Sequence, residues 1–214
     1  MDIQSLGSSL EPLLNWSNAP LNMPSLMALA AGLGWASGLR LYALIFTLGA
    51  LDRFAGVTLP GDLSVLSNVW VLGISGLLLL TEFFADKIPW LDSVWDSIHT
   101  FIRIPAGAAL AGMVMGDQGS AMQIATALLG GTLAAGTHFA KAGTRAAINT
   151  SPEPFTNVAA STAEDAMFAG GMWAMLNYPL LFLGGLAVFV ILAVVLIWLM
   201  WRFVRRLFQR VKTV

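Results

Sequence analysis

Four ionisable residues follow one another at steps of four, three and four positions: Asp92, Asp96, His99 and Arg103. On an α-helix, which turns by about 100° per residue, these side chains fall within an arc of about 60° and form one polar stripe. Carboxylates and an imidazole on one face are suitable ligands for a divalent cation such as Mg²⁺, Mn²⁺, Fe²⁺ or Zn²⁺. The same groups can also hold and pass protons.

Three further polar stripes have helical spacing in segments 66–86, 121–149 and 155–176. In chain order they are Glu82 and Asp86; His138, Lys141, Arg145 and Asn149; and Asn157, Ser161 and Glu164. Arg40 lies near the middle of an otherwise apolar segment, where a cation needs a carboxylate, a carbonyl oxygen or a bound anion as partner. The sequence therefore predicts that polar groups from several helices meet.

Each type of ligand selects a different set of these residues. Candidate ligands of a divalent cation, the one cofactor that the pattern suggests, are Asp92, Asp96, His99, Glu82, Asp86 and Glu164. A proton relay would use Asp96, His99, Glu164 and Asp165, because burial makes carboxylates hold protons more tightly. A small anionic solute would contact Arg40, Arg103, His138, Lys141, Arg145, Asn149, Asn157 and Ser161, with arginine able to bind it bidentately. The alternative to all three is a set of ion pairs that only holds helices together.

The composition places these stripes in a membrane protein. Only 11% of the 214 residues are charged, 57% are hydrophobic, and the mean hydropathy is +0.75. An average soluble domain has about 25% charged residues. Ionisable groups at membrane depth are costly and normally face a bundle interior or a water-filled cavity, so they indicate a functional site. The chain has no cysteine, which excludes disulfides, thiolate-bound clusters and Cys-type zinc sites.

Six segments are long enough to cross a hydrocarbon core, which needs about 20 residues. They are 25–51, 66–86, 90–115, 121–149, 155–176 and 180–201. We therefore predict an all-α fold: a polytopic transmembrane helix bundle of about six spans, in a single domain at 25–201. Segment 1–24 is expected to lie at the membrane interface, and 202–214 to form a basic cytoplasmic tail. The third and fifth segments begin with polar halves, which also suits re-entrant or interfacial helices.

The basic tail predicts the orientation in the membrane. It carries Arg202, Arg205, Arg206, Arg210 and Lys212. Such a patch beside a long apolar segment favours the cytoplasmic side and binds anionic lipid rather than nucleic acid. Six crossings then put both termini in the cytoplasm, and the polar stripes line a vestibule that opens there. On the outer side, glycine pairs spaced for close packing suit helix contacts within the chain or with a second copy in a homo-oligomer: Gly34 and Gly38, and Gly112 and Gly116.

A short internal similarity suggests two related halves. Ser37-Gly38-Leu39-Arg40 resembles Ala142-Gly143-Thr144-Arg145 at the corresponding place in the second half of the chain. With three spans each, repeats 25–116 and 121–201 would be inverted relative to one another. Inverted repeats with broken helices are a recurring transporter design, with the substrate bound where the repeats meet.

Several longer motifs resemble a known family. They are Ala36-Ser37-Gly38-Leu39-Arg40-Leu41-Tyr42, Glu82-Phe83-Phe84-Ala85-Asp86-Lys87-Ile88-Pro89, the stripe from Asp92 to Arg103 leading into Pro105-Ala106-Gly107, and Lys141-Ala142-Gly143-Thr144-Arg145 followed by Ser151-Pro152-Glu153-Pro154. Between Ala28 and Met175 the chain resembles the bacterial membrane-protein family known as domain of unknown function four-one-two-six. The resemblance implies a multi-pass protein of the bacterial inner membrane and supplies no activity.

Three classes of function fit these patterns. The stripes and the possible inverted halves favour a small transporter or channel that moves an ion or small anionic solute, with proton or cation coupling. An enzyme acting on a lipid-linked or phosphorylated substrate is the first alternative, and a structural or assembly protein is the second. The sequence contains no nucleophile motif, Gly-rich phosphate loop or dinucleotide fingerprint, which weakens the enzyme interpretation. We therefore expect a transporter or channel rather than an enzyme.

Overall fold

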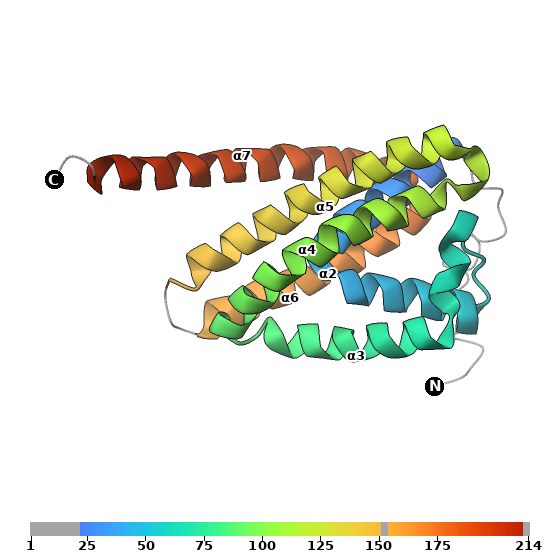
Figure 1. Ribbon diagram of the computed structural model, residues 1–214, viewed down its shortest axis with the longest axis horizontal. Helices are drawn as coiled ribbons and strands as arrows, with labels where there is room; N and C mark the ends of the chain where they lie inside the picture. The colour runs from blue at the N-terminus through green and yellow to red at the C-terminus, as the bar shows by residue number, and fades with distance from the viewer. Residues whose placement is uncertain (1–21, 151–153, 212–214) are drawn as a thin grey trace.

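The computed structural model describes residues 22–150 and 154–211, and within them it confirms the all-α prediction (Figure 1). The elements are α2 (Met23–Ala55), η1 (Gly61–Ser67), α3 (Val69–Ala85), α4 (Pro89–Val114), η2 (Gly116–Gln118), α5 (Ser120–Ile148), α6 (Pro154–Asn177) and α7 (Pro179–Val211). Most of the expected interfacial segment 1–24 lies outside the described residues, as does Lys212 at the end of the basic tail.

Helix α2 is the centre of the bundle and packs against every helix from α3 to α7. The side chain of Asn22 accepts a hydrogen bond from the Ser25 amide at 3.0 Å, which caps the first turn. Gly56 ends the helix in the left-handed conformation, with φ 70°. Between these caps the helix is rich in alanine, glycine and leucine, and the small residues let neighbouring helices approach on all sides.

Helix α2 is interrupted at Arg40, where φ is −142° and ψ is 70°. The sequence predicted one continuous segment here, and neither a proline nor a glycine at this position signals a break. The carbonyl oxygen of the preceding residue, Leu39, accepts a hydrogen bond from Nζ of Lys141 at 3.4 Å. The break therefore brings both the Arg40 side chain and a backbone acceptor into the bundle interior.

Length and composition make three of the described helices able to cross a membrane: α2, α4 and α7. The pair η1 and α3, bent by 72° at Asn68, becomes a fourth if it counts as one broken span. Helices α5 and α6, with 29 and 24 residues, are long enough but carry several of the ionisable residues. The apolar helices are compatible with a membrane protein, and the number of six spans stays a prediction.

Helix α7 lies at the edge of the bundle and extends beyond it (Figure 1). The sequence predicted a span ending near Trp201, whereas the helix continues to Val211. Two residues of the basic tail, Arg202 and Arg205, therefore lie on the last turns of a helix and are exposed. The guanidinium carbon of Arg202 is 5.3 Å from the ring centroid of Trp198.

Helices α2, α4 and α5 cross so closely that their backbones touch at glycines. A methyl group on Gly34 of α2 would meet the backbone of Gly130 on α5, and one on Gly38 would meet the backbone at Ala134. Gly130 in turn faces Ala111 and the carbonyl of Gly107 on α4. The glycine spacing in the first predicted segment thus does mark a close helix crossing, which is made inside the chain.

Two glycines of α5 provide a matched test of this crossing. Gly130→Ala is expected to lower the free energy of unfolding by about 1–3 kcal/mol, because overpacking forces backbones apart. Gly136→Ala on the same helix meets nothing within 4 Å, and should be neutral or stabilising by up to about 1 kcal/mol through helix propensity. Thermal unfolding of both variants in one detergent measures the difference. Equal stabilities would contradict the close crossing.

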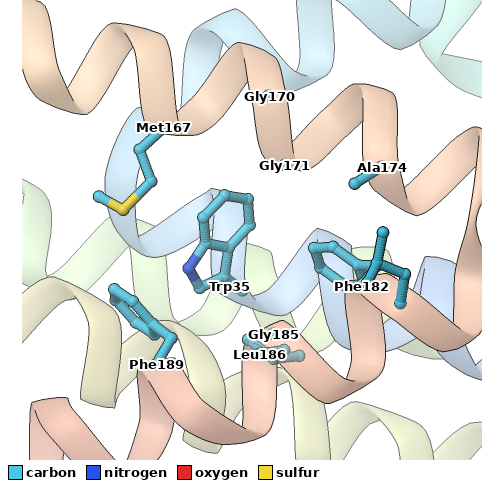
Figure 2. Close-up of a pocket in the computed structure, with 10 residues that line it drawn as sticks. Trp35, Met167, Gly170, Gly171, Ala174, Phe182, Gly185, Leu186 and Phe189 are labelled. Atoms are coloured by element: carbon cyan, nitrogen blue, oxygen red, sulfur yellow. The ribbon is translucent and has the colours of Figure 1, made fainter.

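Helices α6 and α7 pack more loosely, and the indole of Trp35 from α2 lies between them (Figure 2). The indole forms part of the wall of a cavity of about 340 Å³, together with glycines and apolar side chains such as Gly171, Phe182 and Phe189. A second cavity of about 400 Å³ shares Met167 and Phe189 with the first and is lined by other residues as far as Leu196. Apolar space therefore separates parts of α6 and α7.

Candidate functional site

The predicted polar stripes of four segments face one another in the bundle interior. At most 9% of each of the following residues is exposed: Arg40, Glu82, Asp86, Asp92, Asp96, His99, Arg103, His138, Lys141, Arg145, Asn157, Ser161 and Glu164. Asn149 is half-buried, and the Asp165 side chain is 41% exposed. We call these fifteen residues the polar cluster. Each of the four stripes therefore supplies buried residues to the polar cluster, as the sequence predicted.

Arg40, at the break of α2, joins α3 to α6. Its Nη1 forms an ion pair with Oδ2 of Asp86 at the end of α3, and its Nη2 lies 2.8 Å from Oδ1 of Asp165 on α6. The same Nη2 donates to the hydroxyl of Ser161 at 3.1 Å. The guanidinium in the apolar segment therefore has carboxylate partners, one of the three kinds of partner that the sequence required.

Lys141 of α5 is placed among three carboxylates. Its Nζ lies 3.1 Å from Oδ2 of Asp86, 3.6 Å from Oε2 of Glu164 and 3.7 Å from Oδ1 of Asp96. These partners come from the end of α3, from α6 and from α4. The ammonium is fully buried, so it does not reach out to a membrane interface. It acts as a bridge between carboxylates that would otherwise repel one another.

Arg103 of α4 is completely buried and binds two further carboxylates. Its Nη2 lies 2.5 Å from Oε1 of Glu82, and its Nη1 lies 2.8 Å from Oδ1 of Asp96. The Nδ1 atom of His138 is 3.3 Å from the same Nη1. Because a guanidinium nitrogen only donates, this His138 nitrogen must be the acceptor, which keeps the imidazole neutral in this arrangement.

Arg145 of α5 holds Glu164 of α6 in a bidentate ion pair. Its Nε and Nη2 each lie 2.9 Å from one of the two carboxylate oxygens. Its Nη1 donates to Oδ1 of Asn157 at 2.7 Å and to the backbone carbonyl of Asp86 at 3.3 Å. This planar, two-pronged geometry is one that lysine cannot reproduce.

His99 is held by neutral partners, and His138 has one neutral partner besides the Arg103 guanidinium. Nδ1 of His99 is 2.7 Å from the Trp95 carbonyl, and Nε2 is 3.0 Å from the Tyr42 hydroxyl. Nε2 of His138 is 2.6 Å from the hydroxyl of Thr100. Both ring nitrogens of His99 are thus engaged away from the carboxylates, so the structure separates His99 from the other predicted metal ligands.

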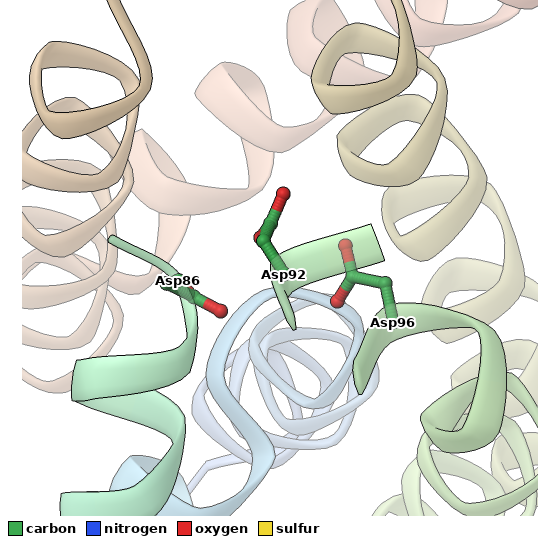
Figure 3. Close-up of side chains that lie close together, drawn as sticks. All are labelled: Asp86, Asp92 and Asp96. Carbon is green, nitrogen blue, oxygen red and sulfur yellow. The ribbon is translucent and has the colours of Figure 1, made fainter. Parts of the chain in front are cut away.

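Three carboxylates come together, and the Lys141 ammonium contacts two of them, Asp86 at 3.1 Å and Asp96 at 3.7 Å. Asp86, at the end of α3, faces Asp92 and Asp96 from the start of α4, and one oxygen of each lies within 4.8 Å of the others (Figure 3). We call these three residues the aspartate triad. Of the predicted metal ligands in the described chain, Glu82, His99 and Glu164 are not part of it. Glu82 pairs with Arg103, and Glu164 pairs with Arg145.

Some contributing residues are not in the predicted stripes. Tyr42, Trp95 and Thr100 bind the histidines, and the hydroxyl of Ser37 donates to the Arg103 carbonyl at 2.7 Å. Thr100 directly follows His99, and Ser37 belongs to the short internal repeat. These positions in the sequence could have indicated a role in the cluster. A hydroxyl or an indole near a charged residue is too common, however, to identify a functional residue from sequence alone.

The second cavity between α6 and α7 borders the polar cluster. Its wall is mainly apolar and includes Lys141 and Glu164 next to residues of α7 such as Leu192 and Leu196. The Glu164 side chain, which is 11% exposed, therefore forms part of this wall, whereas the aspartate triad does not line the cavity.

Comparison with known proteins identifies the family of this chain. Residues 27–202 match the family described as a domain of unknown function, DUF4126. The chain belongs to the DUF4126 family. No curated protein and no solved structure matches it. The match to DUF4126 confirms the resemblance found in the sequence, and it includes every residue of the polar cluster.

Proposed function

We propose that this protein is a small polytopic membrane transporter or channel that moves cations through the polar cluster. The supporting observation is the balance of charge in the network of ion pairs and the triad. It joins six carboxylates to four cationic side chains: Glu82, Asp86, Asp92, Asp96, Glu164 and Asp165 with Arg40, Arg103, Lys141 and Arg145. An excess of negative charge in a low-dielectric interior attracts a proton or a metal ion.

The same network argues against an anionic solute, which the sequence left open. Each of the three guanidinium groups already pairs with a carboxylate: Arg40 with Asp86, Arg103 with Glu82, and Arg145 with Glu164. An anion would have to displace those carboxylates and leave them buried without a partner, which costs several kcal/mol. A cation needs no such exchange.

The form of the helices supports transport rather than a purely structural role. The break of α2 lies at Arg40, and η1 meets α3 at a bend, so two of the candidate spans are discontinuous. Broken helices beside charged groups are typical of ion-binding sites in transporters. Arg40 and Arg145, the matching residues of the short repeat, both contact Asp86. This supports our further proposal of inverted halves, with six spans in the bacterial inner membrane and both termini cytoplasmic.

A second candidate function is favoured by the apolar cavity that reaches Lys141 and Glu164. A lipid-linked substrate could enter it between α6 and α7 and bring a polar group to these two side chains. That enzyme would act without passage of ions across the membrane. Ion flux therefore distinguishes the two candidates.

Reconstitution into liposomes tests the transporter. Vesicles that contain the purified protein, a pH-sensitive dye and a Mn²⁺-quenched dye are given a pH gradient or external Mn²⁺. We expect proton or Mn²⁺ flux well above that of protein-free vesicles. Absence of both fluxes, with protein that is folded and inserted, would contradict the proposal and leave the enzyme or an assembly role.

A further inference from the structure

We infer that the aspartate triad of Asp86, Asp92 and Asp96 is the binding site of one divalent metal ion with a preference for hard oxygen ligands, of the Mg²⁺ and Mn²⁺ class. The inference rests on the proposed function and specifies the cation that the polar cluster receives. It narrows the broad ligand set suggested by the sequence to three residues.

The spacing of the triad suits such an ion. Oxygen ligands lie about 2.0–2.6 Å from Mg²⁺ or Ca²⁺, so two ligands of one ion are at most about 5 Å apart. The three aspartates each offer an oxygen within 4.8 Å of the others. Two of them, Asp92 and Asp96, are one turn apart on α4, and the third comes from the end of α3 beyond a short connection.

Each carboxylate of the triad also has an oxygen without a partner in the described structure. These are Oδ1 of Asp86, Oδ1 of Asp92 and Oδ2 of Asp96, and the three residues are 0%, 0% and 3% exposed. A buried acceptor without a donor or a cation costs about 1–3 kcal/mol, and more when it is charged. Three neighbouring carboxylates that each keep such an atom are suited to a bound cation.

The other oxygen of each aspartate is held by a neighbouring side chain. Arg40 and Lys141 bind Oδ2 of Asp86, and Arg103 binds Oδ1 of Asp96 at 2.8 Å. The Asn149 amide donates to Oδ2 of Asp92 at 3.2 Å. Partners of this kind orient ligating carboxylates in metal sites. Each aspartate thus has one oxygen fixed by a neighbouring side chain and one oxygen with no partner in the described structure.

Asp92 points most directly to a cation. It is completely buried, and among the described residues no ammonium or guanidinium lies within ion-pair distance of it. The carboxylates of the network exceed its cationic side chains by two when the partly exposed Asp165 is counted, and by one among the buried residues. Lys87, at the edge of the cluster, donates to the Phe83 carbonyl and lies over the Phe83 ring instead.

The ligand chemistry selects the class of metal. The triad supplies carboxylate oxygens only, since His99 binds Tyr42 and Trp95 and the sequence has no cysteine. Imidazole and thiolate groups favour Zn²⁺ and Cu²⁺, whereas carboxylates and water favour Mg²⁺ and Mn²⁺. Water would complete the coordination shell on the sides that the three aspartates leave open.

The test uses Mn²⁺ as the probe and the purified full-length chain in detergent. Titration followed by the electron paramagnetic resonance signal of free Mn²⁺ should show one bound ion per chain, displaced by excess Mg²⁺. We expect Asp92→Asn and Asp96→Asn each to weaken Mn²⁺ binding at least about tenfold. Asp117→Asn is the matched control, since Asp117 is exposed in η2 and lies outside the cluster. It should bind as the wild type does.

Two results would overturn the site. One is a wild-type protein that binds no Mn²⁺, and this result does not depend on any variant. The other is equal binding by the wild type and folded Asp92→Asn protein, as judged by circular dichroism. Flux measurements separate this inference from the proposed function. Mn²⁺ binding without flux would support the metal site and contradict the transporter. Proton flux without Mn²⁺ binding would support the transporter and contradict the metal site.

Discussion

Replacement of Arg103 by methionine is expected to lower the free energy of unfolding by about 3–5 kcal/mol, the usual result of removing one partner of a buried ion pair. Arg103 is completely buried, so the change leaves Glu82 and Asp96 without their guanidinium partner in the interior. Methionine fills a similar apolar volume, which separates the loss of charge from the loss of packing. Thermal and denaturant unfolding in detergent measure the effect.

Arg53→Met is the matched control for this prediction. Arg53 is exposed near the end of α2 and donates one hydrogen bond to the Ser67 carbonyl at 3.1 Å. The control should change stability by less than about 1 kcal/mol, as is usual at exposed sites. The double variant Arg103→Met with Glu82→Gln should recover part of the loss, since it removes one of the two unpaired carboxylates. Equal losses in Arg103→Met and Arg53→Met would contradict the buried network.

Asp92→Asn is expected to reduce cation flux at least about tenfold while leaving the metal-free protein as stable as the wild type or more stable. The asparagine oxygen can still accept the hydrogen bond from Asn149. The change removes a buried charge that has no cationic partner in the described structure, and such a charge destabilises the fold. Cation flux is measured in liposomes, and the stability of the metal-free protein is measured by unfolding in the presence of a chelator.

The comparison with Arg103→Met makes this second prediction specific. A carboxylate with only a structural role would behave like Arg103, so that its replacement would lower the free energy of unfolding. A functional one would lose flux and keep its stability. Asp117→Asn should change neither quantity. If Asp92→Asn lowered stability by several kcal/mol without a chelatable metal, Asp92 would be part of the structural ion-pair network and the proposed role would be wrong.

The burial of the polar cluster could be predicted because helical periodicity is a local property. Asp92, Asp96, His99 and Arg103 had to share one face of α4, and the cost of exposing charge to hydrocarbon directed that face inward. The pairing within the cluster could not be predicted. Whether Arg103 binds Glu82 or Asp86 depends on the register between α3 and α4, which no spacing within one helix specifies.

Two features depended on tertiary packing in the same way. The break of α2 at Arg40 is held by contacts to Asp86 and Asp165 from other helices, and its local sequence contains no residue that requires it. His99 had the spacing of a metal ligand on its stripe. The ring turns instead toward Tyr42 of α2, a partner 57 positions away along the chain.

The glycine crossing of α2, α4 and α5 has a consequence for motion. Where Gly34, Gly107 and Gly130 meet, backbone lies against backbone, so these helices cannot slide without a clash. Helices α6 and α7 have empty volume around Trp35 and beyond it. The structure thus consists of a closely packed block of three helices beside two more loosely packed helices, and Arg40, Lys141 and Arg145 of the block bind carboxylates of α6. In the proposed transporter, any movement of α6 away from that block would have to break these three contacts.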